Sequence, residues 1–294
     1  MKKLSLLAVF LLAIPFVSAD CGITNLASCL PEKLYEYTIG VINAPLQPFL
    51  TLTKNLLSEP VNVDGFLSLW AIITYLISLF YGLFLLFAGF NFLLSGYSAL
   101  KREQAKEWIK NIVLMILFIQ ASFYLYTLTL EISSLLTTSI LDLIDPNFFL
   151  LTIDNLANVG LQLVFSGVYL LTMVFSILGL SVRYMLVAIG VVFFPLGIFF
   201  NFIPPIKSYG RLIINTLMIL IFLPFFQALL LLGASKLIEI PIFQNFKILV
   251  MTAAMSLVWC SMVFLLLFAI IKAVIGVWNS SVGQVTRIAA GALK

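Results

Sequence analysis

Long apolar runs, separated by short polar stretches, form the main pattern along this chain of 294 residues. A helix needs roughly 20 residues to cross the hydrocarbon core of a bilayer, which is about 30 Å thick. The charge-free runs that reach this length are 65–100, 111–130, 155–182, 184–206, 212–235 and 248–271. The pattern predicts an all-α fold, a polytopic transmembrane helical bundle with five or six spans, contained in residues 65–272.

The number of crossings depends on the runs 155–182 and 184–206. If both span the membrane, Lys207 and Arg211 fall on the exported side, against the rule that cytoplasmic loops carry the excess of Lys and Arg. If the two runs make one net crossing, both residues become cytoplasmic. The charge rule favours this second arrangement, with five net spans, a cytoplasmic C-terminus and a break or re-entrant turn near Pro195.

Two charged segments orient the chain. Residues 101–110 carry four basic and two acidic side chains, with Glu103 and Lys106 spaced for an i,i+3 ion pair on a short helical turn. This basic turn is predicted to be cytoplasmic. Residues 137–154 contain aspartates but neither Lys nor Arg, and they predict an acidic exported loop.

The N-terminus has the parts of a secretory signal peptide, with Lys2 and Lys3 before an apolar stretch and a small-residue site that ends at Ala19. We expect cleavage that removes 1–19, the alternative being an uncleaved first helix. Residues 20–64 would then be an exported segment, and their loosely amphipathic pattern predicts a helix lying on the membrane surface.

Three cysteines follow the signal peptide. Cys21 and Cys29 would share an oxidising compartment and form a candidate disulfide, with two free thiols as the alternative. Cys260 lies within an apolar run and is predicted to be a small packing residue. At the other end of the chain, 273–294 has apolar positions at helical spacing and predicts an amphipathic tail that continues the last span or lies on the membrane surface.

Composition excludes most catalytic chemistry. Apolar residues make up 63% of the chain, the mean hydropathy is +1.17, and histidine is absent. The chain has no phosphate-binding loop, no nucleophile elbow and no zinc-protease motif. We therefore expect no enzyme activity, no metal and no cofactor.

Charged and polar residues in or beside the apolar runs have two interpretations. Glu131 and Arg183 adjoin runs closely enough to be intramembrane candidates, although an interfacial residue whose side chain reaches the headgroups is the simpler interpretation. The uncharged polar residues either line a water-filled passage, as in a small-solute transporter or channel, or join helices by hydrogen bonds. These residues are Asn91, Gln120, Asn201, Asn215 and Gln227.

Glycine pairs seven residues apart place two small residues on one helix face, where helices can approach closely. Three such pairs are Gly89 with Gly96, Gly160 with Gly167, and Gly276 with Gly283. Packing within the chain is the favoured interpretation, and an oligomer face is the alternative.

Basic residues next to predicted turns are candidates for docking a cytoplasmic partner. They are Lys101, Arg102, Lys106 and Lys110 in the basic turn, and Lys207 and Arg211 after the Pro204-Pro205 step. A tight structural turn is the alternative at the second position.

The order of these parts resembles the TrbL/VirB-type polytopic inner-membrane subunits of type IV secretion and conjugation machines, and the archaeal CedA-like DNA-transfer proteins are similar in organisation. The residues that carry the resemblance are the basic turn 101–110, the exported loop 137–154, the FPLGIF stretch 194–199 and the PPIKSYGR stretch 204–211. It covers most of the chain after the signal peptide.

The resemblance implies a non-enzymatic subunit of a translocation platform in the cytoplasmic (inner) membrane. Such a subunit would assemble with copies of itself as a ring and would contact single-stranded DNA or protein substrates. Separate cytoplasmic ATPases would supply the energy, which fits a chain without a phosphate-binding loop.

Overall fold

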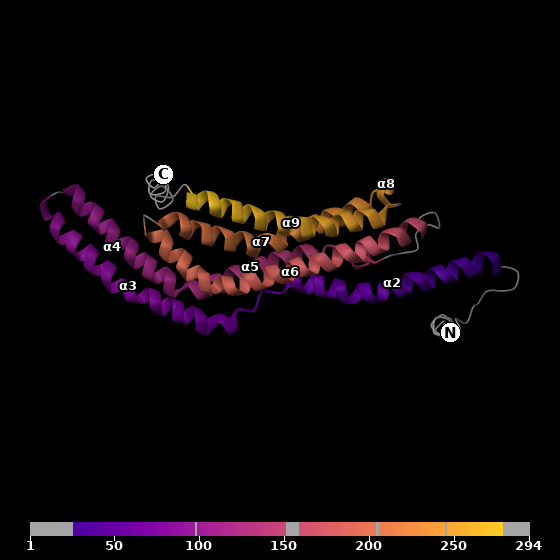
Figure 1. Cartoon of the computed structure of the whole chain (residues 1–294), viewed down its shortest axis with the longest axis horizontal. Coiled ribbons are helices and arrows are strands. Elements are labelled where there is room, and N and C mark those ends of the chain that lie inside the picture. The colour runs from indigo at the N-terminus through magenta and orange to yellow at the C-terminus, as the bar shows by residue number, and fades with distance from the viewer. Residues whose placement is uncertain (1–25, 98, 151–158, 204–205, 245, 279–294) are drawn as a thin grey trace, which may run out of the picture.

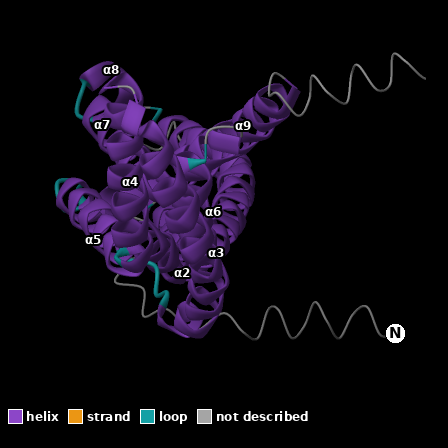
Figure 2. Cartoon of the chain, turned by 90° about the vertical axis from the view of Figure 1, so that its left-hand side faces the viewer, coloured by secondary structure: helices purple, strands orange, loops and turns teal. Residues whose placement is uncertain are grey.

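The computed structural model describes residues 26–97, 99–150, 159–203, 206–244 and 246–278. Within these ranges the chain is helical and contains no strand (Figure 2). The helices are α2 (Leu26–Ser58), α3 (Leu67–Leu94), α4 (Ala99–Gln120), α5 (Ser122–Leu141), α6 (Val159–Phe202), α7 (Lys207–Ile238), α8 (Pro241–Gln244) and α9 (Lys247–Trp278), with the single 3-10 turns η2 (Asp64–Phe66), η3 (Ser95–Tyr97) and η4 (Pro146–Phe149).

Helix α6 is the axis of the bundle (Figure 1). It packs most extensively against α7 and α9 and also contacts α2, α3 and α4. The molecule is elongated, and the α3–α4 hairpin projects beyond the other helices at one end. The helices are apolar on most sides, so each buries one face against its neighbours and leaves apolar residues on the outside, as membrane spans do.

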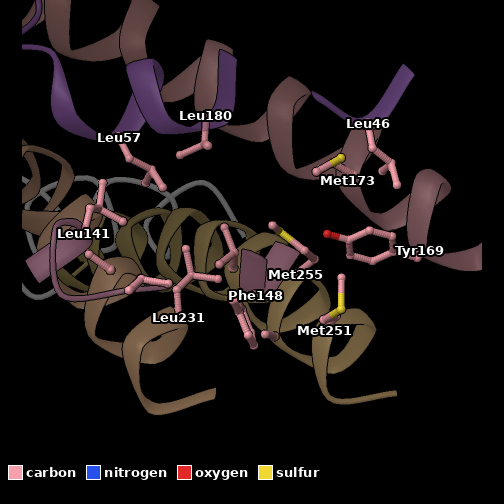
Figure 3. Close-up of a cluster of buried hydrophobic side chains, with 14 of the residues drawn as sticks. Leu46, Leu57, Leu141, Phe148, Tyr169, Met173, Leu180, Leu231, Met251 and Met255 are labelled. Atoms are coloured by element: carbon pink, nitrogen blue, oxygen red, sulfur yellow. The ribbon is translucent and has the colours of Figure 1, made fainter. Parts of the chain in front are cut away.

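Three clusters of buried apolar side chains follow one another along the bundle. The largest joins α2, α6, α7 and α9 (Figure 3), the second joins α5, α6 and α7, and the third joins α3 and α4 to the C-terminal part of α6. Tyr169, Met173 and Met255 in the largest cluster are almost fully buried. Residues from at least three helices meet in each cluster, so packing against α6 holds the bundle together.

Four helices are long and apolar enough to cross a membrane: α3, α6, α7 and α9. The count rises to five if α4 and α5, which are bent by 61° at their junction, form one broken span. The chain is therefore a multi-pass membrane protein. The sequence predicts five or six spans, and the described residues support at most five.

The runs 155–182 and 184–206 do not form two spans. From Val159 to Phe202 they are one continuous helix, α6, and Pro195 lies inside it without a break or re-entrant turn. At 1.5 Å per residue its 44 residues extend about 66 Å, more than twice the hydrocarbon core. The prediction of a break near Pro195 is wrong, because packing on several sides holds the helix through the missing hydrogen bond.

The run 111–130 is not straight. Helix α4 ends at Gln120 and α5 begins at Ser122. The Ser122 hydroxyl donates to the carbonyl oxygen of Ile119 three residues earlier, at 2.6 Å, and such back-bonding bends helices. It also accepts a 2.8 Å hydrogen bond from Trp70 Nε1 of α3, which fixes the bend against the neighbouring helix.

The predicted loop 137–154 begins later than expected. Helix α5 continues to Leu141, and the side chain of Thr137 is fully buried. A turn and η4 follow, and residues 151–158 lie outside the described residues. The acidic residue Asp142 caps the end of α5 and forms a 3.5 Å ion pair with Lys54 of α2.

Residues 26–58 of the predicted exported segment 20–64 form helix α2, and its position on a membrane surface stays a prediction. Helix α2 packs against α6 and α5, with Leu46, Thr53 and Leu57 buried. The predicted signal peptide, 1–19, lies outside the described residues. The last helix does continue beyond residue 271, as far as Trp278, and the rest of the tail 273–294 lies outside the described residues.

Candidate functional site

The predicted basic turn 101–110 forms the first turns of α4, and Lys101, Arg102, Lys106 and Lys110 are all exposed. Arg102, Lys106 and Lys110 follow an i, i+4, i+8 stripe on one face of the helix. Lys106 forms the predicted i,i+3 pair with Glu103 at 3.1 Å. Because this pair is exposed to solvent it stabilises the helix little, so the stripe remains available to a partner.

The second predicted basic position lies at the start of α7. Lys207 and Arg211 are exposed there, and the amide of Ile206 donates to the carbonyl oxygen of Ile203 in a tight turn between α6 and α7. This hydrogen bond fits the structural-turn interpretation, while Pro204 and Pro205 themselves lie outside the described residues. The turn does not compete with docking, because both basic side chains are exposed beside the turn.

Helix α6 brings the two basic positions to the same end of the molecule. Because α6 runs the length of the bundle, the α6–α7 turn lies at the end where the α3–α4 hairpin projects (Figure 1). The two segments flank one cavity of about 260 Å³, lined by Trp108 and Asn111 of α4 and by Phe202 and Ile203 at the end of α6. Lys272, near the C-terminal end of α9, also lies at this end.

Arg183 is the charged group that the structure places most unexpectedly. It lies midway along α6 with 4% of its surface exposed, so the simpler interpretation of an interfacial residue is wrong. Its Nε donates to the carbonyl oxygen of Leu220 on α7 at 2.8 Å. Two longer contacts, of 3.5 and 3.4 Å, reach the carbonyl oxygens of Leu56 on α2 and Ile221 on α7.

Prolines explain why the carbonyl oxygens of Leu56 and Leu220 need a donor from another helix. A helical carbonyl accepts from the amide four residues later, and proline has no amide hydrogen. Leu56 stands four residues before Pro60, and Leu220 stands four residues before Pro224, which lies inside α7. Arg183 therefore supplies hydrogen bonds that the sequence removes from α2 and α7, and it joins these helices to α6.

Gln227 joins helices in a similar way. Its side chain is fully buried on α7, and Nε2 donates at 3.1 Å to the carbonyl oxygen of Val258 and to the hydroxyl of Ser261, both on α9. Of the two interpretations of the polar residues, Gln227 supports helix joining rather than a water-filled passage.

Three glycines of the predicted pairs make no close helix contact within the chain. A Cβ added at Gly89, Gly96 or Gly167 would meet nothing within 4 Å, so the favoured interpretation of intrachain packing is wrong for these three. Gly160 and Gly276 lie in α6 and α9, and Gly283 lies outside the described residues.

Three other glycines make the close helix contacts. A Cβ at Gly190 would lie 2.5 Å from Leu217 Cδ2, and one at Gly197 would lie 3.0 Å from Ile213 Cγ2. At Gly210 it would overlap the backbone of Gly197 and Asn201. Gly190 and Gly197 are themselves seven apart, so the spacing rule that selects the other pairs is sufficient to find them. Which pair faces a neighbouring helix depends on the fold.

The predicted disulfide cannot be placed in the fold, because Cys21 lies outside the described residues and Cys29 belongs to the first turn of α2. Cys260 is on α9, as expected, but it is exposed and does not pack inside the bundle. Within the described part of the chain, no three His, Cys, Asp or Glu residues are grouped closely enough to hold a metal ion.

The chain matches no known protein family, no curated protein and no solved structure.

Proposed function

We propose that this chain is a non-enzymatic, self-associating subunit of a membrane translocation platform, of the kind that serves type IV secretion, conjugation or DNA transfer. The observation that carries the proposal is the gathering of Arg102, Lys106, Lys110, Lys207 and Arg211 at one end of the bundle; we call these five residues the docking surface. Two turns that are far apart in sequence form it together.

The charge rule gives this end its orientation. Cytoplasmic segments of membrane proteins carry the excess of Lys and Arg. With α6 as one crossing, the turns after α3 and after α6 face the same side, which we assign to the cytoplasm of the inner membrane. At the opposite end, the connection from α7 through α8 to α9 carries Lys236, Glu239 and Lys247 (Figure 1).

Partners follow from this orientation. An exposed basic surface on the cytoplasmic side suits acidic partners, which include single-stranded DNA and the acidic faces of soluble ATPases. An ATPase is needed because the chain has no phosphate-binding loop of its own. The buried donors of Arg183 and Gln227 are engaged by other helices, which weighs against a polar solute site in the bundle.

The exposed apolar sides of the helices are available for self-association. Only Thr74, Ile77 and Ala88 of α3 are buried, whereas large apolar side chains such as Leu79 and Leu83 are exposed. Lipid or a second copy covers such surfaces in a membrane. A ring of copies would place many docking surfaces around one axis.

Site-specific photo-crosslinking tests the proposal. A photoreactive amino acid at Arg102 and at Arg211 should capture the same ATPase with a phosphate-binding loop, and the same residue at Lys236, at the opposite end, should not. The double variant Arg102→Glu, Arg211→Glu should lose DNA or protein transfer at a normal level of membrane-inserted chain. Capture of the ATPase from Lys236 alone, or full transfer by the double variant, would contradict the proposal.

A further inference from the structure

Two adjoining cavities between α3 and α4 differ in polarity. The outer cavity, about 520 Å³, lies beside the hairpin turn and is lined by Asn91, Ser95, Lys101 and Gln104 together with apolar side chains. The inner cavity, about 260 Å³, is lined by Phe84, Ile112, Met115, Phe202 and Ile203 together with Asn111. Trp108 lines both, so the two cavities adjoin at its side chain.

Helical periodicity separates this cleft from the docking surface. Lys101, Gln104 and Trp108 lie on the face of α4 that is turned to α3, at positions i, i+3 and i+7. Arg102 lies on a different face. Lys106 is paired with Glu103, whereas Lys101 has no carboxylate of a described residue within ion-pair distance.

We propose that this cleft binds one anionic phospholipid, with its phosphate at Lys101 and one acyl chain directed past Trp108 into the inner cavity. A cation and amide groups at the mouth with apolar walls beyond match a molecule that has a charged head and an apolar tail. The Trp108 ring packs on Phe87, with 5.7 Å between ring centroids, and tryptophan is a residue enriched at the headgroup level of membranes. Basic pockets between spans are known to select anionic headgroups.

A phosphate group alone does not meet the requirements of this cleft. A free phosphate or a headgroup fragment would use Lys101 but not the apolar cavity, and a zwitterionic lipid would use the cavity but would gain less from the cation. An anionic phospholipid uses both parts of the cleft. The inference is independent of the proposed translocation role, because it depends only on α3, α4 and the end of α6.

The proposed lipid site is tested by native mass spectrometry of the full chain in detergent, which compares the affinities of lipids of equal acyl length. Phosphatidylglycerol should bind about fivefold more tightly than phosphatidylcholine, the equivalent of ~1 kcal/mol for one basic residue, and glycerol 3-phosphate should not bind. Equal binding of the two lipids by the native chain, or binding of glycerol 3-phosphate as tight as that of the lipid, would overturn the proposal.

Three variants locate the site. Lys101→Gln should abolish the preference for phosphatidylglycerol, and the control Arg102→Gln, which removes the same charge from another face of α4, should retain it. Ile203→Trp, which fills the inner cavity, should weaken both lipids. Equal loss of preference in Lys101→Gln and Arg102→Gln would show general attraction to a basic surface and would refute a site at Lys101.

Discussion

Arg183 shows how one side chain offsets two prolines. Pro60 and Pro224 each remove the amide that would bond to a carbonyl oxygen four residues earlier, and the guanidinium of Arg183 reaches both of these oxygens. Leaving a buried acceptor unpaired costs about 1–3 kcal/mol. The cation also lies beside the C-terminal end of α2, where the helix dipole is negative. A charge that would be costly in an apolar bundle thus meets acceptors that need a donor.

Replacement of Arg183 by Met should therefore destabilise the chain by about 1–3 kcal/mol for each acceptor left unpaired, seen as a lower thermal unfolding midpoint in detergent. In a Pro224→Ala background the same replacement should cost less, because the introduced alanine would return an amide donor to Leu220. Pro195→Ala, on α6 and distant from Arg183, is the matched control and should be additive. If the Arg183 replacement were coupled in stability to Pro195→Ala as strongly as to Pro224→Ala, this account of Arg183 would be refuted.

Gly210 lies where α7 closely approaches the backbone of α6. An added Cβ would meet the backbone of Asn201 and Gly197, which cannot rotate away as a side chain can. Gly210→Ala should lower the stability by about 1–3 kcal/mol. Gly233→Ala on the same helix, where a Cβ meets nothing within 4 Å, should be neutral or stabilising because Ala favours helix. Thermal unfolding of both variants checks this, and a stable Gly210→Ala chain would contradict it.

At the scale of elements, the bend between α4 and α5 is fixed by one hydroxyl. Ser122 accepts from Trp70 Nε1 and donates to the carbonyl oxygen of Ile119. The bend turns α5 along α7, where the Ser133 hydroxyl donates to the carbonyl oxygen of Ile221 at 2.7 Å. The bent pair of α4 and α5 thus contacts α3 through Ser122 and α7 through Ser133.

Ser122→Ala should leave the Trp70 indole N–H without its acceptor and should cost about 1–3 kcal/mol. The control Ser139→Ala removes an exposed hydroxyl of α5 that bonds only to the carbonyl oxygen of Leu135, and it should change stability by less than about 0.5 kcal/mol. Denaturation in detergent compares the two. An equal effect of both replacements would show that the bend does not depend on the Trp70 contact.

At the scale of the whole molecule, α6 decides which turns share a side. Cysteines at Lys106 and Ser208 should be labelled by an impermeant reagent from one side, and a cysteine at Gln244 in α8 from the other. The background must lack the native cysteines, because Cys260 is exposed. Labelling of Lys106→Cys and Ser208→Cys from opposite sides would contradict the arrangement with α6 as one crossing.

Hydropathy alone determined the class of this protein. Its long apolar runs require helices, because helices satisfy their backbone hydrogen bonds without water, and most of the predicted runs appear as helices. The helical basic turn with its Glu103–Lys106 pair was also predictable, because it depends only on neighbours along the chain.

The tertiary structure alone decided which residues make contacts between helices, because such contacts depend on which helix faces meet. The seven-residue rule proposes several glycine pairs, and only the fold selects Gly190 and Gly197. A charge between two apolar runs predicts an interfacial residue, yet Arg183 lies buried within one helix because acceptors on α2 and α7 compensate its burial. Lys101 and Arg102 are neighbours in sequence, but one helix position separates a residue that lines a cavity from a residue of the docking surface.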